Sequence, residues 1–557
     1  MNIIDSIRYS KTDPRCIRYL FPKAVSLTQG NVSDPENLLK ELPLQIGLSE
    51  SVLCELKNDG GENAAVVLDY GVELCGGLRL LTGFITGEKY PLVRLTFGES
   101  MSEAMSSVGE KNATNEHSIR DFTVPLSFLS DMQFGNTGFR FVKIELLTQD
   151  CTLRIKSAVA AFVFRDVKQL GSFECSDSLV NRIYDTAVYT CLLNMQNLLW
   201  DGIKRDRLVW IGDMHPEMLT IRSVFGADPI IPESMDFVMD QTPLPGWMNG
   251  MPSYSMWWTV LLWDWYVYTG DKEFLCARKD YALALIRQLA AIVDPDGSDN
   301  LPSYFLDWPT NNTPAAVCGS RALLRMALKA GAELATFFGD LELVRSCSAS
   351  RRALNNRTDD HCGYSQAAAF MALSGASDPV EINREVLSPK GGHGMSTFMA
   401  YYILKAMSLA GNTVGAVKAL KQYYGGMLDM GATTFWEDFD LKWMENACPI
   451  DRLPKNGESD VHGDNGAFCY LGFRHSLCHG WSSGVAPFLT ERVLGVDILT
   501  PGCKSIVLRP DLGGLEWARG SFPTPMGILE VECEKGSDGR VLTKLNAPDG
   551  VNVERFN

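Results

Sequence analysis

The spacing of apolar and polar residues divides the chain into three regions. Up to about residue 170, short β-branched or aromatic runs alternate with Gly, Asn, Asp and Ser, which is typical of strands joined by turns. From there to about residue 496, apolar residues recur three and four positions apart, the period of a helix with one buried face. Alternating runs then return. The pattern therefore predicts the order β, α, β, with the following elements: strands over 65–75, 77–85, 90–100, 140–148 and 151–164; helices over 178–200, 253–269, 275–292, 313–339, 342–355, 364–374, 397–410, 413–427 and 478–495; strands over 504–510, 515–522 and 528–535.

The three regions predict a multidomain α+β protein. We expect an antiparallel β-sandwich over 1–170, consecutive helical hairpins, closed or stacked, over 171–496, and a small second β-sandwich over 497–557. A chain of 557 residues is longer than one hydrophobic core usually organises. The small, polar segment 101–118 is expected to be a surface excursion.

Charge and composition exclude several partners. The 67 acidic and 51 basic residues give a formal charge of −16 without a long Lys/Arg run, which argues against nucleic acid. No uncharged apolar run is long enough to span a bilayer, so no membrane is expected. The first residues lack the pattern of a secretory signal, and this favours a cytoplasmic protein.

The cysteines and histidines give no sign of a metal site. The 15 cysteines are scattered without a CxxC pair, as expected for free thiols in a reducing compartment. His475 and His479 are four residues apart, but no acid or cysteine stands at ligand spacing from them. We therefore expect neither a metal nor another cofactor.

An acidic cluster, "DGIKRDRLVWIGDMHPE", occupies residues 201–217. Its four carboxylates, Asp201, Asp206, Asp213 and Glu217, could simply cap helices or form solvated ion pairs. Tryptophans are dense in and after the cluster, however. A pocket that binds a sugar also combines acidic side chains, which accept hydroxyl hydrogen bonds, with aromatic rings.

A second acidic motif, "GATTFWEDFD", lies at 431–440. Glu437 in this motif could be an acid favoured at the start of a helix. Together with the first cluster it also supplies what glycoside hydrolysis requires, one group to protonate the leaving oxygen and another to activate water.

Five segments, in the same order along the chain, resemble the α-L-rhamnosidases of glycoside hydrolase family 78. They are "DGIKRDRLVWIGD" (201–213), "GATTFWE" (431–437), "SLCH" (476–479), "PGCKSIVLRP" (501–510) and "EWARGSFPTPMG" (516–527). The resemblance implies a central (α/α)6 barrel between β-sandwiches, an inverting mechanism and terminal α-L-rhamnose as the substrate, taken from plant-type oligosaccharides or glycosides.

The resemblance also assigns residues. Glu437 matches the family's general base, and Asp206 stands where the family's catalytic acid is a glutamate, one methylene longer. Asp201 and Asp213 match acids that hold sugar hydroxyls in relatives. Asp307, Trp308, Trp436 and His479 match pocket-lining positions of the family. The other residues predicted to bind the substrate are Arg205, Trp210, Glu217 and Trp258, which lie in or after the acidic cluster.

Three alternatives stay open at this point. Glu217 or another acid could donate the proton in place of Asp206, since a carboxylate set back by a methylene can cost about 10²-fold in rate. The same fold could act on another sugar, because a fold does not fix its substrate. The chain could also be a sugar-binding protein with impaired catalysis. The sequence leaves homo-oligomer formation undecided.

Overall fold

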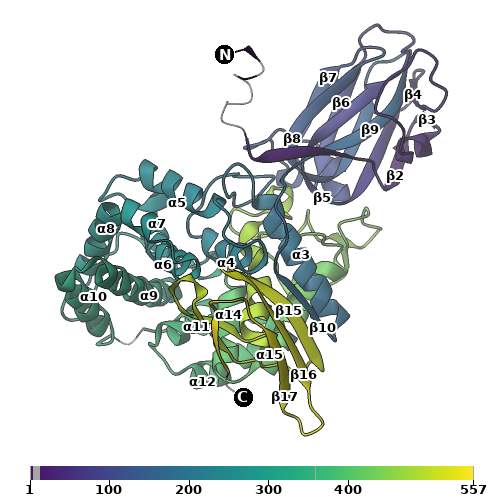
Figure 1. The fold of residues 1–557 in the computed structure, drawn as a ribbon. Coiled ribbons are helices and arrows are strands. Elements are labelled where there is room, and N and C mark those ends of the chain that lie inside the picture. The colour runs from purple at the N-terminus through teal and green to yellow at the C-terminus, as the bar shows by residue number, and fades with distance from the viewer. Residues whose placement is uncertain (1, 4, 6–12, 358, 556–557) are drawn as a thin grey trace.

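The protein is described here from a computed structural model that covers residues 2–3, 5, 13–357 and 359–555. The predicted domains include residues 1, 4, 6–12, 358 and 556–557, which lie outside the described residues. Figure 1 shows the N-terminal strands at one end of the molecule, the helices beside them, and the C-terminal strands packed along the helices. The order β, α, β is confirmed.

The N-terminal region forms one sheet of nine strands in which every pair is antiparallel, as predicted. The strand order is β3-β4-β9-β5-β8-β6-β7, with β1 paired to β9 and β2 to β5. The strands are β1 (Arg15–Leu20), β2 (Ala24–Gln29), β3 (Asn31–Ser33), β4 (Cys54–Asn58), β5 (Ala65–Thr82), β6 (Leu92–Gly98), β7 (Asp121–Pro125), β8 (Asp131–Leu146) and β9 (Cys151–Arg165).

The runs predicted over 65–75 and 77–85 belong to a single strand, β5. At their junction Gly76 has a φ of 149°, and the register against β8 shifts between Gly76 and Leu78. A Cβ at Gly76 would lie 2.0 Å from the Ala161 carbonyl oxygen. Glycine therefore lets one strand bend where the sequence pattern suggests a break.

The prediction of a surface excursion over 101–118 is wrong for its first residues. Met101–Met105 form helix α2, and four of these five residues are buried. The Ser100 hydroxyl caps the helix by accepting the Glu103 N–H at 3.1 Å. The segment is polar yet buried because Glu103 is paired with Lys204.

The helical region begins directly after a short strand and alternates long helices with loops. Helix α6 is rich in Trp and Tyr and is buried on nearly all sides, so it forms part of the core. The helices are α3 (Ser178–Asn194), α4 (Met214–Val224), α5 (Ile230–Gln241), α6 (Pro252–Thr269), α7 (Lys272–Ala277), α8 (Lys279–Ala291), α9 (Pro314–Phe338), α10 (Leu341–Leu354), α11 (Ser365–Ser374), α12 (Pro379–Ile382), α13 (Ser388–Lys390), α14 (Ala400–Leu409), α15 (Thr413–Asp429) and α16 (Val485–Phe488).

The helix predicted over 478–495 is a series of short turns, of which α16 is the only α-helical one. Its first residues are held by other contacts, since Gly480 N–H donates to the Asp201 carbonyl at 2.7 Å. A Cβ at Gly480 would lie 1.5 Å from Glu217 Oε1, so the chain passes against a buried carboxyl.

The C-terminal strands form a four-stranded sheet, β10-β15-β16-β17, and a three-stranded sheet, β13-β14-β18. Strand β10 precedes the helical region, so this sheet joins both ends of it. The strands are β10 (Ser172–Cys175), β13 (Val496–Thr500), β14 (Ser505–Leu508), β15 (Trp517–Thr524), β16 (Gly527–Lys535), β17 (Val541–Asn546) and β18 (Asn552–Arg555), and a separate pair joins β11 (Ala447–Cys448) to β12 (Ser459–Asp460).

Two large cores hold these regions together. One joins the helices to the C-terminal sheets, and the other lies in the N-terminal sheet, where Leu193, Ile203 and Cys478 of the helical region join it. All fifteen cysteines are free thiols. Among the described residues, no helix is both long and apolar enough to cross a bilayer.

Candidate active site

Residues 201–213 of the acidic cluster form a loop between α3 and α4 that is closed on itself. Asp201 N–H donates to the Leu208 carbonyl at 3.0 Å, and Leu208 N–H donates to Asp201 Oδ1 at 2.9 Å. Between them Asp206 and Arg207 have φ values of 58° and 56°, in the left-handed region that side chains disfavour. Such strain persists where surrounding contacts fix the backbone, as they often do at functional sites.

The two acidic motifs, far apart in the sequence, meet in the fold. Glu437 and Ser476 exchange two hydrogen bonds: Glu437 N–H donates to the Ser476 carbonyl at 3.0 Å, and Ser476 N–H donates to Glu437 Oε2 at 3.1 Å. Gly202 in turn forms a β-bridge with His479. The segment 475–480 thereby ties Glu437 to the 201–213 loop.

A cavity of about 890 Å³ opens between these segments. Aromatic side chains and carboxylates line it together, which is the composition expected of a site for a polyhydroxylated ligand. Eight of the twelve predicted site residues line the cavity: Asp201, Arg205, Asp206, Trp210, Asp213, Trp308, Glu437 and His479.

Arg205 links the two carboxylates predicted to be catalytic. Its Nη1 donates to Asp206 Oδ1 at 2.7 Å, and its Nη2 donates to Glu437 Oε1. Burial opposes the charge on Glu437, but the Arg205 guanidinium and then His479 outweigh it, and the pKa of Glu437 lies below its ordinary value. Glu437 is therefore a carboxylate at neutral pH, as a general base must be.

His479 lies between Asp201 and Glu437, with its Nε2 3.6 Å from Asp201 Oδ2 and 3.7 Å from Glu437 Oε1. Burial opposes the protonated form, but the two carboxylates more than offset it and raise the pKa of His479. The cavity lining thus pairs two cationic side chains, Arg205 and His479, with carboxyl groups.

Asp213 differs from Glu437 in the direction of its pKa shift. Its Oδ1 accepts a hydrogen bond from the Tyr254 hydroxyl at 2.7 Å, and burial raises the pKa of Asp213 to about 8. Burial also raises the pKa of Asp201. A carboxyl that is protonated at neutral pH can donate a hydrogen bond or a proton.

The remaining four predicted residues do not line the cavity. Asp307 supports Trp308, since its Oδ1 accepts the Trp308 N–H at 2.8 Å. Glu217 is buried behind Gly480, Trp436 packs edge-on against Phe439, and Trp258 donates to the Met235 carbonyl at 3.4 Å. Spacing along the sequence does not reveal which face of a helix or loop an aromatic residue presents.

Several lining residues were missed by sequence reasoning. Trp481 follows the predicted His479 by two residues, Tyr470 precedes it by nine, and Phe305 stands two residues before Asp307, so proximity to a predicted residue was their only signal. Phe305 packs edge-on against Trp308 with ring centroids 5.4 Å apart. The missed lining residues include Asn249, Met251, Tyr254, Tyr304, Phe305, Tyr470 and Trp481.

Two buried nitrogens at the cavity have unused hydrogen-bonding capacity. Trp210 Nε1 and His479 Nδ1 have no hydrogen-bond partner among residues 13–357 and 359–555. Buried polar groups are nearly always paired, so these atoms are suited to hydroxyl groups of a ligand.

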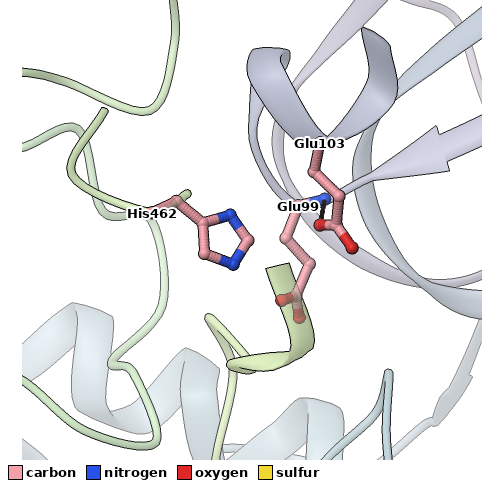
Figure 2. Close-up of side chains that lie close together, drawn as sticks. All are labelled: Glu99, Glu103 and His462. Atoms are coloured by element: carbon pink, nitrogen blue, oxygen red, sulfur yellow. Dashed lines mark hydrogen bonds between the residues drawn. The ribbon is translucent and has the colours of Figure 1, made fainter. Parts of the chain in front are cut away.

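One further cluster has the composition of a metal site. Glu99, Glu103 and His462 bring one ligand atom each to within 4.8 Å of one another (Figure 2). Lys204 Nζ, however, lies 2.8 Å from Glu99 Oε2 and 3.2 Å from Glu103 Oε1. Both ring nitrogens of His462 are also engaged, with Ser100 Oγ and the His475 carbonyl. The protein's own ammonium group therefore occupies the place of a cation.

Comparison with known proteins bears out the family resemblance. Residues 168–367 match the family model of the bacterial α-L-rhamnosidase six-hairpin glycosidase domain, and residues 495–554 match that of the bacterial α-L-rhamnosidase C-terminal domain. A curated α-L-rhamnosidase of Alteromonas sp. is 23% identical in an alignment that covers 85% of this chain and 54% of that protein. The chain thus spans about half the length of this relative.

Solved structures share the fold. The family 78 rhamnosidase of Bacillus sp. GL1 aligns with a TM-score of 0.76 and 20% identity, over 93% of this chain and 55% of that chain. A rhamnosidase of Klebsiella oxytoca with rhamnose bound aligns with a TM-score of 0.64 and 19% identity, over 85% of this chain and 95% of that chain. The fold is therefore that of the family 78 rhamnosidases, with a six-hairpin helical domain and sheets.

Proposed function

We propose that this chain, which resembles the α-L-rhamnosidases of glycoside hydrolase family 78, is an inverting glycoside hydrolase that removes terminal α-L-rhamnose. The observation that carries the proposal is a cavity in which Asp206 and Glu437, from distant parts of the chain, contact one guanidinium. Inverting hydrolysis needs two carboxyl groups on opposite sides of the sugar, one as acid and one as base.

Glu437 is the proposed general base. It is ionised, it is held by Ser476 N–H, and its carbonyl oxygen is fixed by the Trp481 indole N–H at 3.0 Å. In this role Glu437 removes a proton from the water that attacks the anomeric carbon, while the bond to the leaving oxygen breaks.

Asp206 is the proposed proton donor, and its side chain reaches the cavity. Its Oδ1 accepts a hydrogen bond from Arg205, so Oδ2 is the oxygen that would carry the donated proton. Asp213 is the competing donor because it lines the same cavity and carries a proton at neutral pH. Glu217 is a weaker candidate, since it lies outside the lining of the cavity.

The finer architecture and biology belong to the same proposal. The helical hairpins of residues 171–496 close into an (α/α)6 barrel between β-sandwiches over 1–170 and 497–557. The substrate is a plant-type rhamnosylated oligosaccharide or glycoside, and the aromatic residues around Trp308 support binding of its sugar rings. A cytoplasmic location is supported by the fifteen free cysteines.

Hydrolysis of para-nitrophenyl α-L-rhamnoside, beside a panel of other para-nitrophenyl sugars, tests the function. The wild-type protein is expected to release nitrophenol from the rhamnoside. Glu437→Gln and the variant of the true donor should each lower kcat by about 10²- to 10⁴-fold. Asp206→Asn, Asp213→Asn and Glu217→Gln compared side by side identify that donor.

Each outcome selects one interpretation. Loss of turnover in Asp206→Asn, with Asp213→Asn affecting mainly KM, supports the proposed pair. The reverse pattern moves the donor role to Asp213. Release from a different sugar would replace the proposed substrate. If the protein binds rhamnose but turns over no sugar in the panel, it is a sugar-binding protein, an alternative that the Arg205–Asp206 ion pair favours.

A further inference from the structure

Glu99 stands at the end of strand β6 in the N-terminal sheet, and its side chain is fully buried. A buried carboxylate is costly unless charged or hydrogen-bonding partners surround it. All of the partners of its carboxylate belong to the helical region. The residue therefore joins the two regions at a point close to the candidate active site.

The Glu99 carboxylate holds one short segment of the helical region. Its Oε2 accepts the Leu477 N–H at 2.6 Å, and its Oε1 accepts the Ser476 hydroxyl at 3.2 Å. Oε2 also lies 2.8 Å from Lys204 Nζ. Both oxygens are thus engaged by groups of the 201–213 loop and the 475–480 segment.

Lys204 extends the same contact. Its ammonium group donates to the Phe473 carbonyl at 2.9 Å and to the His475 carbonyl at 2.6 Å, besides contacting Glu99. Two carbonyls and two carboxylates, those of Glu99 and Glu103, surround this one ammonium and fix the backbone on the N-terminal side of Ser476. The neighbouring residue in the loop, Arg205, contacts Glu437.

Ser476 connects this network to Glu437. The Ser476 N–H donates to Glu437 Oε2, and its carbonyl accepts the Glu437 N–H. Ser476 therefore links the Glu99 carboxylate to the carboxylate of the proposed base. The adjoining contacts, Ser100 Oγ to His462 Nδ1 at 2.8 Å and Met101 N–H to the Ile450 carbonyl at 2.8 Å, anchor the end of β6 in the same place.

We propose that Glu99 is a positioning residue for Glu437: it holds residues 475–478 in the conformation that directs the Ser476 N–H at the Glu437 carboxylate. The inference rests on the proposed role of Glu437 as the general base. It gives the N-terminal sheet an indirect part in the reaction, through the Ser476 N–H, which the cavity lining alone does not show.

Glu99→Gln tests the proposal, with Glu103→Gln as a matched control. Both residues are buried beside Lys204, but only Glu99 contacts the 475–478 segment. Glu99→Gln should lower kcat on para-nitrophenyl α-L-rhamnoside by about tenfold or more, with KM changed less than about threefold. The acidic limb of the kcat/KM profile should move to higher pH, because Glu437 loses an oriented hydrogen-bond donor.

A second readout does not depend on activity. In hydrogen–deuterium exchange the amides of Ser476 and Leu477 should exchange faster in Glu99→Gln than in the wild type or Glu103→Gln. If Glu99→Gln does not fold, Ser476→Ala removes one of the same bonds and should lower kcat in the same direction. An unchanged kcat in that variant would overturn the proposal.

The failures of the two proposals are distinguishable. If the wild type hydrolyses no rhamnoside, the proposed function fails and exchange at Ser476 and Leu477 alone decides the role of Glu99. If the wild type is active, the positioning role is overturned by an unchanged kcat and pH profile in Glu99→Gln. It is overturned equally if Glu103→Gln causes the same loss, since the effect would then belong to Lys204.

Discussion

At the residue scale, Arg205 controls the charge of the proposed base. Of the cations near the buried Glu437, Arg205 lowers its pKa most. One terminal nitrogen of Arg205 contacts Glu437 and the other contacts Asp206. Without it, burial would raise the pKa of Glu437, because a low-dielectric site disfavours the charged form.

Arg205→Met should therefore move the acidic limb of the kcat/KM profile to higher pH. The base acts only when ionised, which happens above its pKa, and loss of the guanidinium raises that pKa. We also expect kcat/KM at the pH optimum to fall by about 10- to 100-fold. The pH dependence of rhamnoside hydrolysis between pH 3 and 9 measures both effects.

Arg207→Met is the matched control for this prediction. Arg207 belongs to the same loop, but its Nη1 donates to the Asn136 carbonyl at 2.8 Å and its guanidinium lies over the Trp200 ring. Its loss should leave the acidic limb in place. An equal displacement in both variants would show that the loop conformation, and not the Arg205 charge, determines the pKa.

The residues of the site were predictable where a motif carried them. The site residues predicted inside the two acidic motifs all line the cavity except Trp436 and Glu217. Trp258 was chosen for its place in a tryptophan-rich stretch, but α6 turns it toward Met235. The missed Tyr254 is on the same helix and faces Asp213. Only packing decides which side chains of such a helix face the cavity.

At the element scale, strand β10 links the start of the helical region to the C-terminal sheet. It pairs antiparallel with β15, and Phe173 stands opposite Gly520 in that pair. Phe173 is 5% exposed and packs against Tyr184 of α3 with ring centroids 5.7 Å apart. Phe173 is therefore one of the side chains that fasten the sheet to the helices.

Phe173→Ala should lower the free energy of unfolding by about 3–5 kcal/mol, because it removes a buried ring and leaves a cavity. Urea denaturation followed by circular dichroism measures the change. Leu542→Ala, on β17 of the same sheet, is the control, since Leu542 is 60% exposed and should change stability by less than about 0.5 kcal/mol. Equal effects would mean that β10 does not anchor the sheet.

Elements with strong periodicity were predictable, and those fixed by distant contacts were not. The helices over 314–338 and 413–429 lie close to their predicted ranges. Helix α2 was predicted to be a surface loop because a polar sequence does not indicate a buried helix. The paired charges that permit this burial, on Glu103 and Lys204, are about a hundred residues apart in the sequence. The closure of the C-terminal sheet by β10 is likewise a long-range pairing.

At the scale of the whole molecule, the order of the regions followed from the change of apolar period along the chain. Their association did not, because it depends on contacts between residues far apart in the sequence, both in the shared core and in polar pairs. Arg140 of the N-terminal sheet reaches the Gly431 carbonyl at 3.3 Å, and Thr433 Oγ1 accepts the Glu73 N–H at 2.9 Å. With the contacts of Glu99, these bonds attach the sheet to the segments that carry Glu437.

The stereochemistry of hydrolysis tests the central claim most directly. Proton NMR of the first product released from para-nitrophenyl α-L-rhamnoside distinguishes the two anomers before mutarotation, with Glu437→Gln as the inactive control. An inverting enzyme that uses Glu437 to activate water releases β-L-rhamnose first, and the variant releases none at a comparable rate. Initial release of α-L-rhamnose, or undiminished turnover in Glu437→Gln, would contradict the account.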